Sequence, residues 1–243
     1  MGTTTKQGYF GTPPIVTRGL VLHLDAGSRQ SYVSGSTTWS DLSGNGYNGT
    51  LTNNPTASSI NQGTIFFNGT NNYITSSATT LNLSTTSNFT YCSWIYPDFS
   101  SAGATGKAII DFTGPSPIFL RSYLRWEGSS LGFYMDIADN TGGSAWRTNP
   151  VPAFSANTWH YICITHASDN TAQYYFDGQA TPTALLASLA RTVTNNSITI
   201  GYGAVNSYYW SGGISITKVY NRSLSAAEIN QNYNALKNRF GLT

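Results

Sequence analysis

The chain has 243 residues, of which only 9% are charged, and its 12 basic and 10 acidic side chains give a formal net charge of +2. An ordinary globular domain carries about 25% charged residues; here 29 Ser, 32 Thr and 22 Asn take their place. The near-neutral charge excludes a nucleic-acid binder, which needs a basic surface, and the 14% aromatic content excludes a disordered chain.

Residues 1–14 are rich in Gly, Thr and Pro, and we interpret them as an N-terminal arm. The arm contains no apolar run and therefore does not resemble a secretory signal. No later stretch approaches the roughly 18 apolar residues that span a bilayer, so no membrane contact is expected. Residues 15–243 carry no linker or repeat, which predicts a single domain.

The run 15–24 has Leu20, Leu22 and Leu24 at alternate positions and is the first predicted strand. A turn-dense segment follows at 25–49, where glycines are frequent. Further strands are predicted at 64–68, 72–75, 88–96, 107–113, 117–126, 131–137, 158–166, 172–177, 197–203 and 213–220. Short strands separated by turn residues predict an all-β sandwich or barrel. Asn68-Gly69 and Asp177-Gly178 are expected to form hairpin turns.

Two cysteines, Cys92 and Cys163, lie in two of these apolar runs. A pair is too few for a disulfide framework, and the favoured interpretation is two buried free thiols that act as small hydrophobic side chains. The alternative is one disulfide bridge, which would require an oxidising compartment.

One helix is predicted, at the C-terminal end. Ser225 and Glu228 have the spacing of a capping box, and Leu224 is placed to pack against Ile229. Apolar residues then recur at helical spacing on one face until Gly241, which is expected to end the helix. The helix is expected to pack on the sandwich, with docking of a partner as the alternative.

Several segments, taken in order, carry a resemblance to a known family. They are 19–27 (GLVLHLDAG), 39–51 (WSDLSGNGYNGTL), 66–69 (FFNG), 72–74 (NYI), 158–161 (TWHY), 174–178 (YYFDG) and 219–229 (VYNRSLSAAEI). Together they resemble the laminin-G-like, concanavalin A-like jelly-roll family over roughly residues 19–240. The resemblance implies an all-β, two-sheet antiparallel jelly-roll sandwich with a short C-terminal helix, and a core position for Trp159.

Within that family, the chain is similar to copies carried by tailed bacteriophages. This resemblance implies a non-enzymatic virion structural protein, either a capsid decoration or a tail or fibre accessory. Other virion proteins would be its partners, and a homo-oligomer is expected, with the virion as its location. The alternative is a carbohydrate-binding adhesion module that recognises host-surface glycans, on a virion or in an extracellular setting.

No catalytic residues are predicted. Glycoside hydrolases need a pair of carboxylates, and the chain has only two glutamates, Glu127 and Glu228. Glu228 is already placed in the helix cap, and Glu127 has no carboxylate two or four residues further along the chain. The three histidines are interpreted as partly buried structural residues. A hydrolase is therefore the weakest functional hypothesis.

Calcium is the one metal ion that the sequence suggests. Asp41, Ser43 and Asn45 follow the first half of an EF-hand loop, but Thr52 stands where the bidentate Glu is required. Laminin-G-like domains often hold one calcium ion at a sandwich rim, and by this resemblance the candidate ligands are Asp25, Asp41 and Asn45. The alternative is that these side chains form Asx turns with their own backbone.

Aromatic side chains are the candidates for a binding surface. Tyr208 and Tyr209, with Tyr32 and Trp146, are predicted to contact a glycan or a protein, because aromatic faces stack on sugars and are enriched at interfaces. Packing within the core is the alternative for each of them. The neighbouring Trp210 is expected to be buried.

Overall fold

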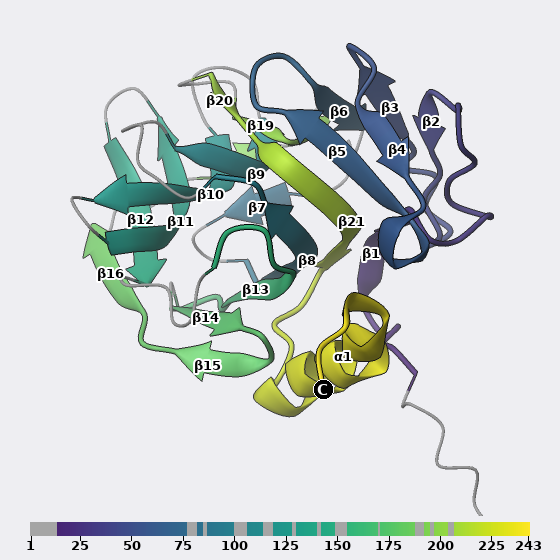
Figure 1. Ribbon diagram of the computed structural model, residues 1–243. Helices are drawn as coiled ribbons and strands as arrows, with labels where there is room; N and C mark the ends of the chain where they lie inside the picture. Colours follow the sequence, from purple (N-terminus) through teal and green to yellow (C-terminus); the bar gives the residue numbers. More distant parts are fainter. Residues whose placement is uncertain are drawn as a thin grey trace, which may run out of the picture.

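The computed structural model describes residues 14–76, 82–84, 87–99, 106–113, 119–127, 130–139, 142–148, 155–169, 171–187, 192–194, 197–203 and 207–243. Over these residues the strands form two antiparallel sheets packed face to face, with one short helix near the C-terminus (Figure 1). The predicted jelly-roll sandwich is therefore confirmed. Most of the predicted arm, residues 1–13, lies outside the described residues, so the domain boundary stays a prediction.

Sheet A contains eight of the described strands. In spatial order they are β15 (Gln179–Thr181), β14 (Ala172–Phe176), β13 (His160–His166), β8 (Phe89–Pro97), β21 (Ser211–Tyr220), β5 (Thr64–Asn68) and β4 (Thr56–Ser58), with β1 (Leu20–Asp25) also paired to β21.

Sheet B contains nine of the described strands, and two short ribbons complete the fold. The order in sheet B is β16 (Ala184–Ala187), β12 (Gly142–Thr148), β11 (Ser130–Asp139), β10 (Phe119–Glu127), β9 (Lys107–Thr113), β18 (Ser197–Ile200), β6 (Tyr73–Ser76), β3 (Gly49–Thr52) and β2 (Thr38–Trp39). The ribbons are β7 (Asn82–Ser84) with β17 (Thr192–Thr194), and β19 (Tyr202–Gly203) with β20 (Tyr208–Tyr209).

The main core lies between the two sheets. Phe67 and Phe89 from sheet A meet Phe112 and Phe133 from sheet B, and all four side chains are at most 3% exposed. Because side chains alternate between the two faces of a strand, the remaining residues of each sheet point outward. The two outer faces are therefore where a binding site or a covering element can lie.

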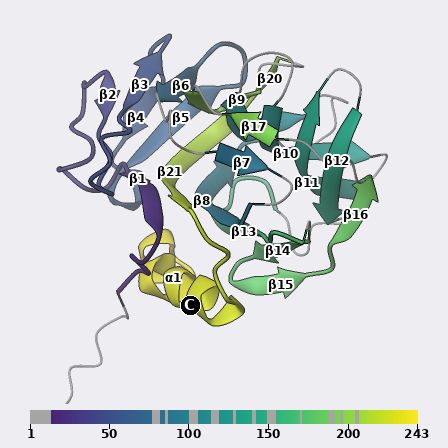
Figure 2. The ribbon, with the colours of Figure 1, turned by 180° about the vertical axis from the view of Figure 1, so that it is seen from behind.

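A second core covers the outer face of sheet A. The helix α1 (Ala226–Leu236) continues into the 3₁₀ helix η2 (Lys237–Phe240), and both pack their apolar side chains on this face. Phe240 stacks on Trp94 with ring centroids 4.1 Å apart, and it also contacts the predicted core residue Trp159, which is 6% exposed. Figures 1 and 2 show α1 from opposite sides. No helix in the described residues is long and apolar enough to cross a membrane.

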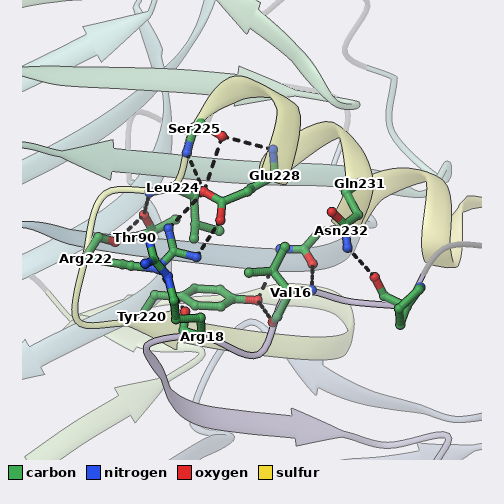
Figure 3. Close-up of polar contacts among 11 residues, drawn as sticks. Val16, Arg18, Thr90, Tyr220, Arg222, Leu224, Ser225, Glu228, Gln231 and Asn232 are labelled. Atoms are coloured by element: carbon green, nitrogen blue, oxygen red, sulfur yellow. Dashed lines mark hydrogen bonds and ion pairs between the residues drawn. The ribbon is translucent and has the colours of Figure 1, made fainter.

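Polar contacts at its first turn and in its middle fix α1 (Figure 3). The predicted capping box is present, since Ser225 and Glu228 bond reciprocally, and Arg222 adds two bonds of 2.8 and 2.6 Å to the Glu228 carboxylate. In the middle of the helix, the Asn232 side chain accepts a bond of 2.8 Å from the backbone N–H of Val16. The α-helix itself ends at Leu236, and Gly241, with the left-handed φ of 75° expected of a helix stop, ends the 3₁₀ helix η2 that continues it. The segment before β1 is thus bound to the C-terminal helix.

The structure corrects the favoured interpretation of the cysteines. Cys92 and Cys163 are directly opposite each other on β8 and β13, and they form a disulfide across these neighbouring strands. Both are buried in the second core, beneath α1. The two cysteines are 71 residues apart in the sequence, and only the register of β8 and β13 brings them together.

The two predicted hairpin turns behave differently. Asp177 and Gly178 both have positive φ and join β14 to β15 as a tight hairpin, as expected. At Asn68-Gly69 the hairpin prediction is wrong, because the chain passes there from sheet A to sheet B. The Asn68 side chain accepts bonds from the N–H groups of Thr70, Asn71 and Asn72, and so forms the crossing turn locally.

Candidate functional site

Three half-buried tyrosines gather on the outer face of sheet B. Tyr202 and Tyr209 are directly opposite each other on β19 and β20, with ring centroids 4.6 Å apart and planes tilted by 25°. Tyr73 of β6 lies 5.4 Å from Tyr202. We call these three residues the tyrosine stack.

The β19–β20 ribbon owes its position to its base, where the residue before β19 faces the residue after β20. Gly201, before β19, has a φ of +80°, and a Cβ there would lie 2.5 Å from the Phe67 ring, so only glycine fits without rearrangement. The carbonyl of Gly201 accepts a bond of 2.9 Å from the N–H of Trp210. As predicted, the Trp210 side chain is fully buried, and it anchors the base of the ribbon in the main core.

Tyr208 holds the ribbon against sheet B through Arg121 of β10. The Arg121 guanidinium carbon lies 4.7 Å from the Tyr123 ring centroid and 5.0 Å from that of Tyr208. The guanidinium also pairs with the Asp136 carboxylate at 3.1 Å, although Arg121 is only 4% exposed. The charged group thus supports the ribbon from beneath, since cations are attracted to the faces of aromatic rings.

A row of polar side chains crosses the same outer face. Thr38, Thr50, Thr75 and Thr199 are successive register partners on β2, β3, β6 and β18. Directly paired residues of antiparallel strands point to the same face, at the strand spacing of about 4.8 Å. We call these residues the threonine row, and Tyr73 of the tyrosine stack is two residues from Thr75 on the same face.

The row continues through charged residues toward the middle of the sheet. Thr199 pairs with Asp111, Asp111 with Arg121, and Arg121 with Asp136. The positive charge of Arg121 therefore stands between two carboxylates. The outer face of sheet B therefore combines half-buried aromatic rings, threonine hydroxyls and a row of three charged side chains whose signs alternate.

Two tyrosine hydroxyls on this face, those of Tyr209 and Tyr123, have a raised pKa and stay neutral. Burial raises the pKa of Tyr209, and the neighbouring Tyr202 raises it further. Burial and the Asp136 carboxylate likewise raise the pKa of Tyr123. Neutral hydroxyls can both donate and accept hydrogen bonds, as the hydroxyl groups of a sugar do.

The four predicted aromatic contacts are not in one place. The structure brings Tyr208 and Tyr209 together, in the ribbon described above. Tyr32 lies elsewhere, at the side of the sandwich, where it is 9% exposed and its hydroxyl donates to the Ser36 carbonyl at 3.2 Å. The backbone of Trp146 belongs to β12, but its side chain lies outside the described residues.

The three candidate calcium ligands take part in local hydrogen bonds. The Asp25 carboxylate accepts from the Gly27 N–H and pairs with Arg239 at 2.7 Å. Asp41 accepts from the backbone N–H groups of residues 23, 43 and 47, while the Asn45 side chain donates to the Val21 carbonyl. Among the described residues, no group of three or more His, Cys, Asp or Glu is arranged to hold a metal ion. Calcium stays a prediction, which thermal melts with and without EDTA would test.

The residues considered for catalysis have structural partners. His160 contacts the Asp177 carboxylate at 3.1 Å and is 4% exposed, and the fully buried His166 stacks on Phe89. Glu228 belongs to the helix cap. The side chain of Glu127 lies outside the described residues.

Sequence reasoning missed Tyr73, Tyr202 and the threonine row. Tyr73 and Tyr202 lie in the predicted strands 72–75 and 197–203, but no local pattern shows that β6 and β19 bring them together. The threonine row depends on four strands from distant parts of the chain, two of which were not predicted.

Comparison with protein families gives one match. The family described as the concanavalin A-like lectin/glucanases superfamily matches residues 68–230. A search of curated proteins found no sequence match.

Solved structures share the fold at low identity. The binding domain of botulinum neurotoxin serotype G is 17% identical, with a TM-score of 0.67 over 87% of this chain and 50% of that one. The binding domain of Paraclostridial Mosquitocidal Protein 1 is 20% identical, with a TM-score of 0.66 over 92% and 55%. The chain thus spans about half the length of these toxin structures.

A third structure matches over nearly its whole length. Domain 4 of AbnA, an extracellular GH43 arabinanase from Geobacillus stearothermophilus solved in complex with arabinotriose, is 13% identical. Its TM-score is 0.64 over 88% of this chain and 98% of that one. At these identities the likeness establishes the fold alone.

Proposed function

The chain belongs to the concanavalin A-like lectin/glucanase superfamily, and on this premise we propose that it is a non-catalytic module that binds glycans through the outer face of sheet B. The tyrosine stack supplies aromatic faces for the C–H surface of a sugar ring, and Thr38, Thr50 and Thr75 of the threonine row supply hydroxyls for its polar edge. Thr199, the fourth member of the row, is buried, and its hydroxyl donates to the Tyr202 carbonyl at 2.8 Å. The observation that carries the proposal is the half-buried stack of Tyr73, Tyr202 and Tyr209 beside the threonine row.

The comparisons support a binding role at a coarser level. The toxin structures are binding domains, and domain 4 of AbnA was solved with arabinotriose. The similarity of this chain to them extends to the fold, so the ligand class comes from the tyrosine stack and the threonine row.

The charged residues on the same face favour binding over hydrolysis. A glycoside hydrolase needs one carboxyl group with a raised pKa to act as an acid. Arg121 stands in register between Asp111 and Asp136 and pairs directly with Asp136. The Asp136 carboxylate is therefore engaged by a guanidinium, whereas a general acid has to present its proton to the leaving group.

A glycan microarray probed with the purified chain tests the proposal. We expect binding to a defined set of neutral oligosaccharides, and we expect the Tyr209→Ala variant to lose this binding because one face of the stack is removed. Gln179→Ala is the matched control, because Gln179 is exposed and lies on β15, the edge strand of the other sheet. Absence of binding to any glycan, or equal binding by Tyr209→Ala, would contradict the proposal.

We further propose the virion of a tailed bacteriophage as the setting of this module, with capsid or tail proteins and further copies of the chain as partners. The support is the sequence resemblance to phage-borne copies of the family. Mass spectrometry of purified particles tests the location, and light scattering of the purified chain tests oligomer formation. A chain absent from particles whose genome encodes it would refute this setting without affecting glycan binding.

A further inference from the structure

We propose that a groove at the side of the sandwich binds an extended acidic peptide, which adds as a strand to the free edge of β4. The groove consists of two adjoining hollows of about 450 and 220 Å³ that share Tyr32, Ser34 and Ala57. We call it the β4 groove, and it lies apart from the tyrosine stack.

The groove opens where both sheets end. β4 is the last strand of sheet A and β2 is the last strand of sheet B, and Figure 1 shows both at the same side of the molecule. Among the described strands, β4 pairs only with β5, so its other edge has no strand partner. Unpaired N–H and C=O groups along an edge strand are a template for an incoming extended chain.

The wall formed by η1 (Ile60–Gln62) is held in place by contacts with the C-terminal segment. The Asn61 side chain donates to the Arg239 carbonyl at 2.8 Å and accepts from the indole N–H of Trp159 at 3.0 Å. Asn61 and Gln62 have φ values of 52° and 64°, in the left-handed region that non-glycine residues seldom occupy. The chain thus turns sharply after β4 and leaves the strand edge open.

The opposite wall is the loop that contains Tyr32. The N–H of Tyr32 bonds to the Ser28 carbonyl at 2.8 Å, and its hydroxyl bonds to the Ser36 carbonyl. The Tyr32 ring packs in the main core and contributes to the lining of both hollows. Both walls are therefore formed before any ligand arrives, which lowers the entropic cost of binding.

Two exposed aliphatic side chains flank the groove. Val33 is 62% exposed and Ile60 is 54% exposed, and they are the exposed large hydrophobic residues of the described part of the chain. Val33 stands between the lining residues Tyr32 and Ser34, and Ile60 directly follows the lining residue Ser59. Side chains of an added strand alternate between its two faces, so apolar residues at every second position of a peptide would cover these two side chains.

The positive charge of the groove favours an acidic peptide. Arg29 is the one charged residue among those that line the two hollows, and no described carboxylate forms an ion pair with it. An acidic side chain of the ligand would supply the missing partner, because a guanidinium binds a carboxylate with two parallel hydrogen bonds. A sugar would use the hydroxyl groups of the groove but would leave the strand edge and the aliphatic side chains without partners.

A random dodecapeptide library displayed on ribosomes tests the proposal with the full chain. We expect wild-type protein to enrich peptides that carry an acidic residue near aliphatic residues at alternate positions. A synthetic, fluorescein-labelled copy of an enriched peptide should bind wild type at least tenfold more tightly than the Arg29→Glu variant. Hydrogen–deuterium exchange of the β4 amides should slow when this peptide binds.

Three controls separate this site from others. Arg18→Glu makes the same charge change at an exposed arginine outside the groove and should leave peptide affinity within twofold of wild type. Proline placed at alternate positions of the peptide should abolish binding, since it removes the N–H donors of an added strand. Tyr209→Ala should have no effect on peptide binding, so failure here is distinct from failure of the glycan proposal.

Two results would overturn the proposal. One is enrichment of the same peptides by a counter-selection variant that combines Arg29→Glu, Val33→Ser and Ile60→Ser, provided its thermal melt matches wild type. The other is that the wild type enriches no peptide but binds a glycan, and that the triple variant loses this glycan binding. That result would assign the groove to a sugar.

Discussion

Tyr202 and Tyr209 stack as a directly opposed pair across β19 and β20, with their ring centroids 4.6 Å apart. Each ring restricts the rotamers of the other, and Tyr73 extends the stack over β6. Cross-strand aromatic pairs stabilise a two-stranded ribbon, and a ring that is already ordered loses little entropy when a ligand stacks on it. The pair therefore connects the local fold of the ribbon with its proposed role in binding.

Replacement of Arg121 by Met should destabilise the protein strongly. Arg121 is 4% exposed and pairs with Asp136, so the change leaves a carboxylate without this partner. Loss of one partner of a buried ion pair costs about 3–5 kcal/mol. Guanidinium chloride unfolding measures this cost. The Arg121→Met/Asp136→Leu double variant should recover part of it, and a single variant as stable as wild type would contradict the structural role of the pair.

The Glu228→Gln variant should show a loss of stability that depends on pH. The bonds from Arg222 lower the pKa of Glu228 to about 2, below its ordinary value of 4.5. Because the folded-state pKa is the lower one, the carboxylate stabilises the fold fully above about pH 4.5, and the effect is lost as the pH falls toward 2. Melting temperatures of variant and wild type should differ most at pH 7 and converge near pH 2.

Ser225→Ala is the control for that experiment. It removes the hydroxyl that accepts from the Glu228 N–H and costs about 1 kcal/mol as a helix cap. Its effect on the melting temperature should change less with pH, because the Ser225 hydroxyl contributes less than Arg222 to the lowered pKa of Glu228. If the melting temperatures of Glu228→Gln and wild type differ by the same amount from pH 7 to pH 2, the ion pair with Arg222 does not stabilise the fold.

The Lys218→Met variant should be more stable than wild type at neutral pH. Lys218 is 1% exposed, its amine has no hydrogen-bond partner among the described residues, and burial lowers its pKa from 10.5 to about 8. Between pH 8 and pH 10.5 the Lys218 amine binds more protons in the unfolded chain than in the folded one. The stability of the wild type therefore rises with pH across this window. The buried charge therefore destabilises the fold most below pH 8. Removing it in Lys218→Met should raise the free energy of unfolding by as much as about 3 kcal/mol.

Chemical unfolding of the Lys218→Met variant at pH 7 and pH 10 measures this difference. The advantage of the variant should shrink at the higher pH, where the wild-type amine is already neutral. A variant less stable than wild type at pH 7 would show that the charged amine has a stabilising partner.

Reduction of the disulfide between Cys92 and Cys163 should lower stability. The bridge closes a loop with a sequence separation of 71 residues, for which chain entropy predicts a contribution of about 4 kcal/mol. Unfolding with and without a reductant measures it, and the Cys92→Ala/Cys163→Ala double variant should not respond to the reductant. Titration of two free thiols in the protein purified under oxidising conditions would contradict the pairing.

Local patterns predicted the parts of the fold that local interactions determine. The capping box at Ser225 and Glu228 and the stop at Gly241 are where the sequence places them, because each is formed by residues close together in the chain. Long apolar runs such as β8 and β9 were predicted to within one residue or so at each end. The two-residue strands β2 and β20 were missed because such short segments contain no periodicity to detect.

Features that depend on register were not predictable from local patterns. The Cys92–Cys163 bridge requires β8 and β13 to be neighbours with these residues opposite each other. Tyr208 and Tyr209 were recognised as candidates because they are adjacent in the sequence, whereas Tyr73 joins them only through strand order. Tyr32 was predicted as a surface contact, with core packing as the alternative. Its ring packs in the core, and its place in a wall of the β4 groove depends on the positions of β4 and β2.

Isothermal titration calorimetry with the best oligosaccharide from the microarray tests the central claim most directly. The account predicts that the Tyr202→Ala/Tyr209→Ala variant binds this oligosaccharide at least tenfold more weakly than wild type, which corresponds to about 1.4 kcal/mol of binding free energy. The Gln179→Ala variant, changed at an exposed residue of sheet A, should bind as wild type does. Equal affinity of the tyrosine variant and wild type, with both proteins folded, would contradict glycan binding at the tyrosine stack.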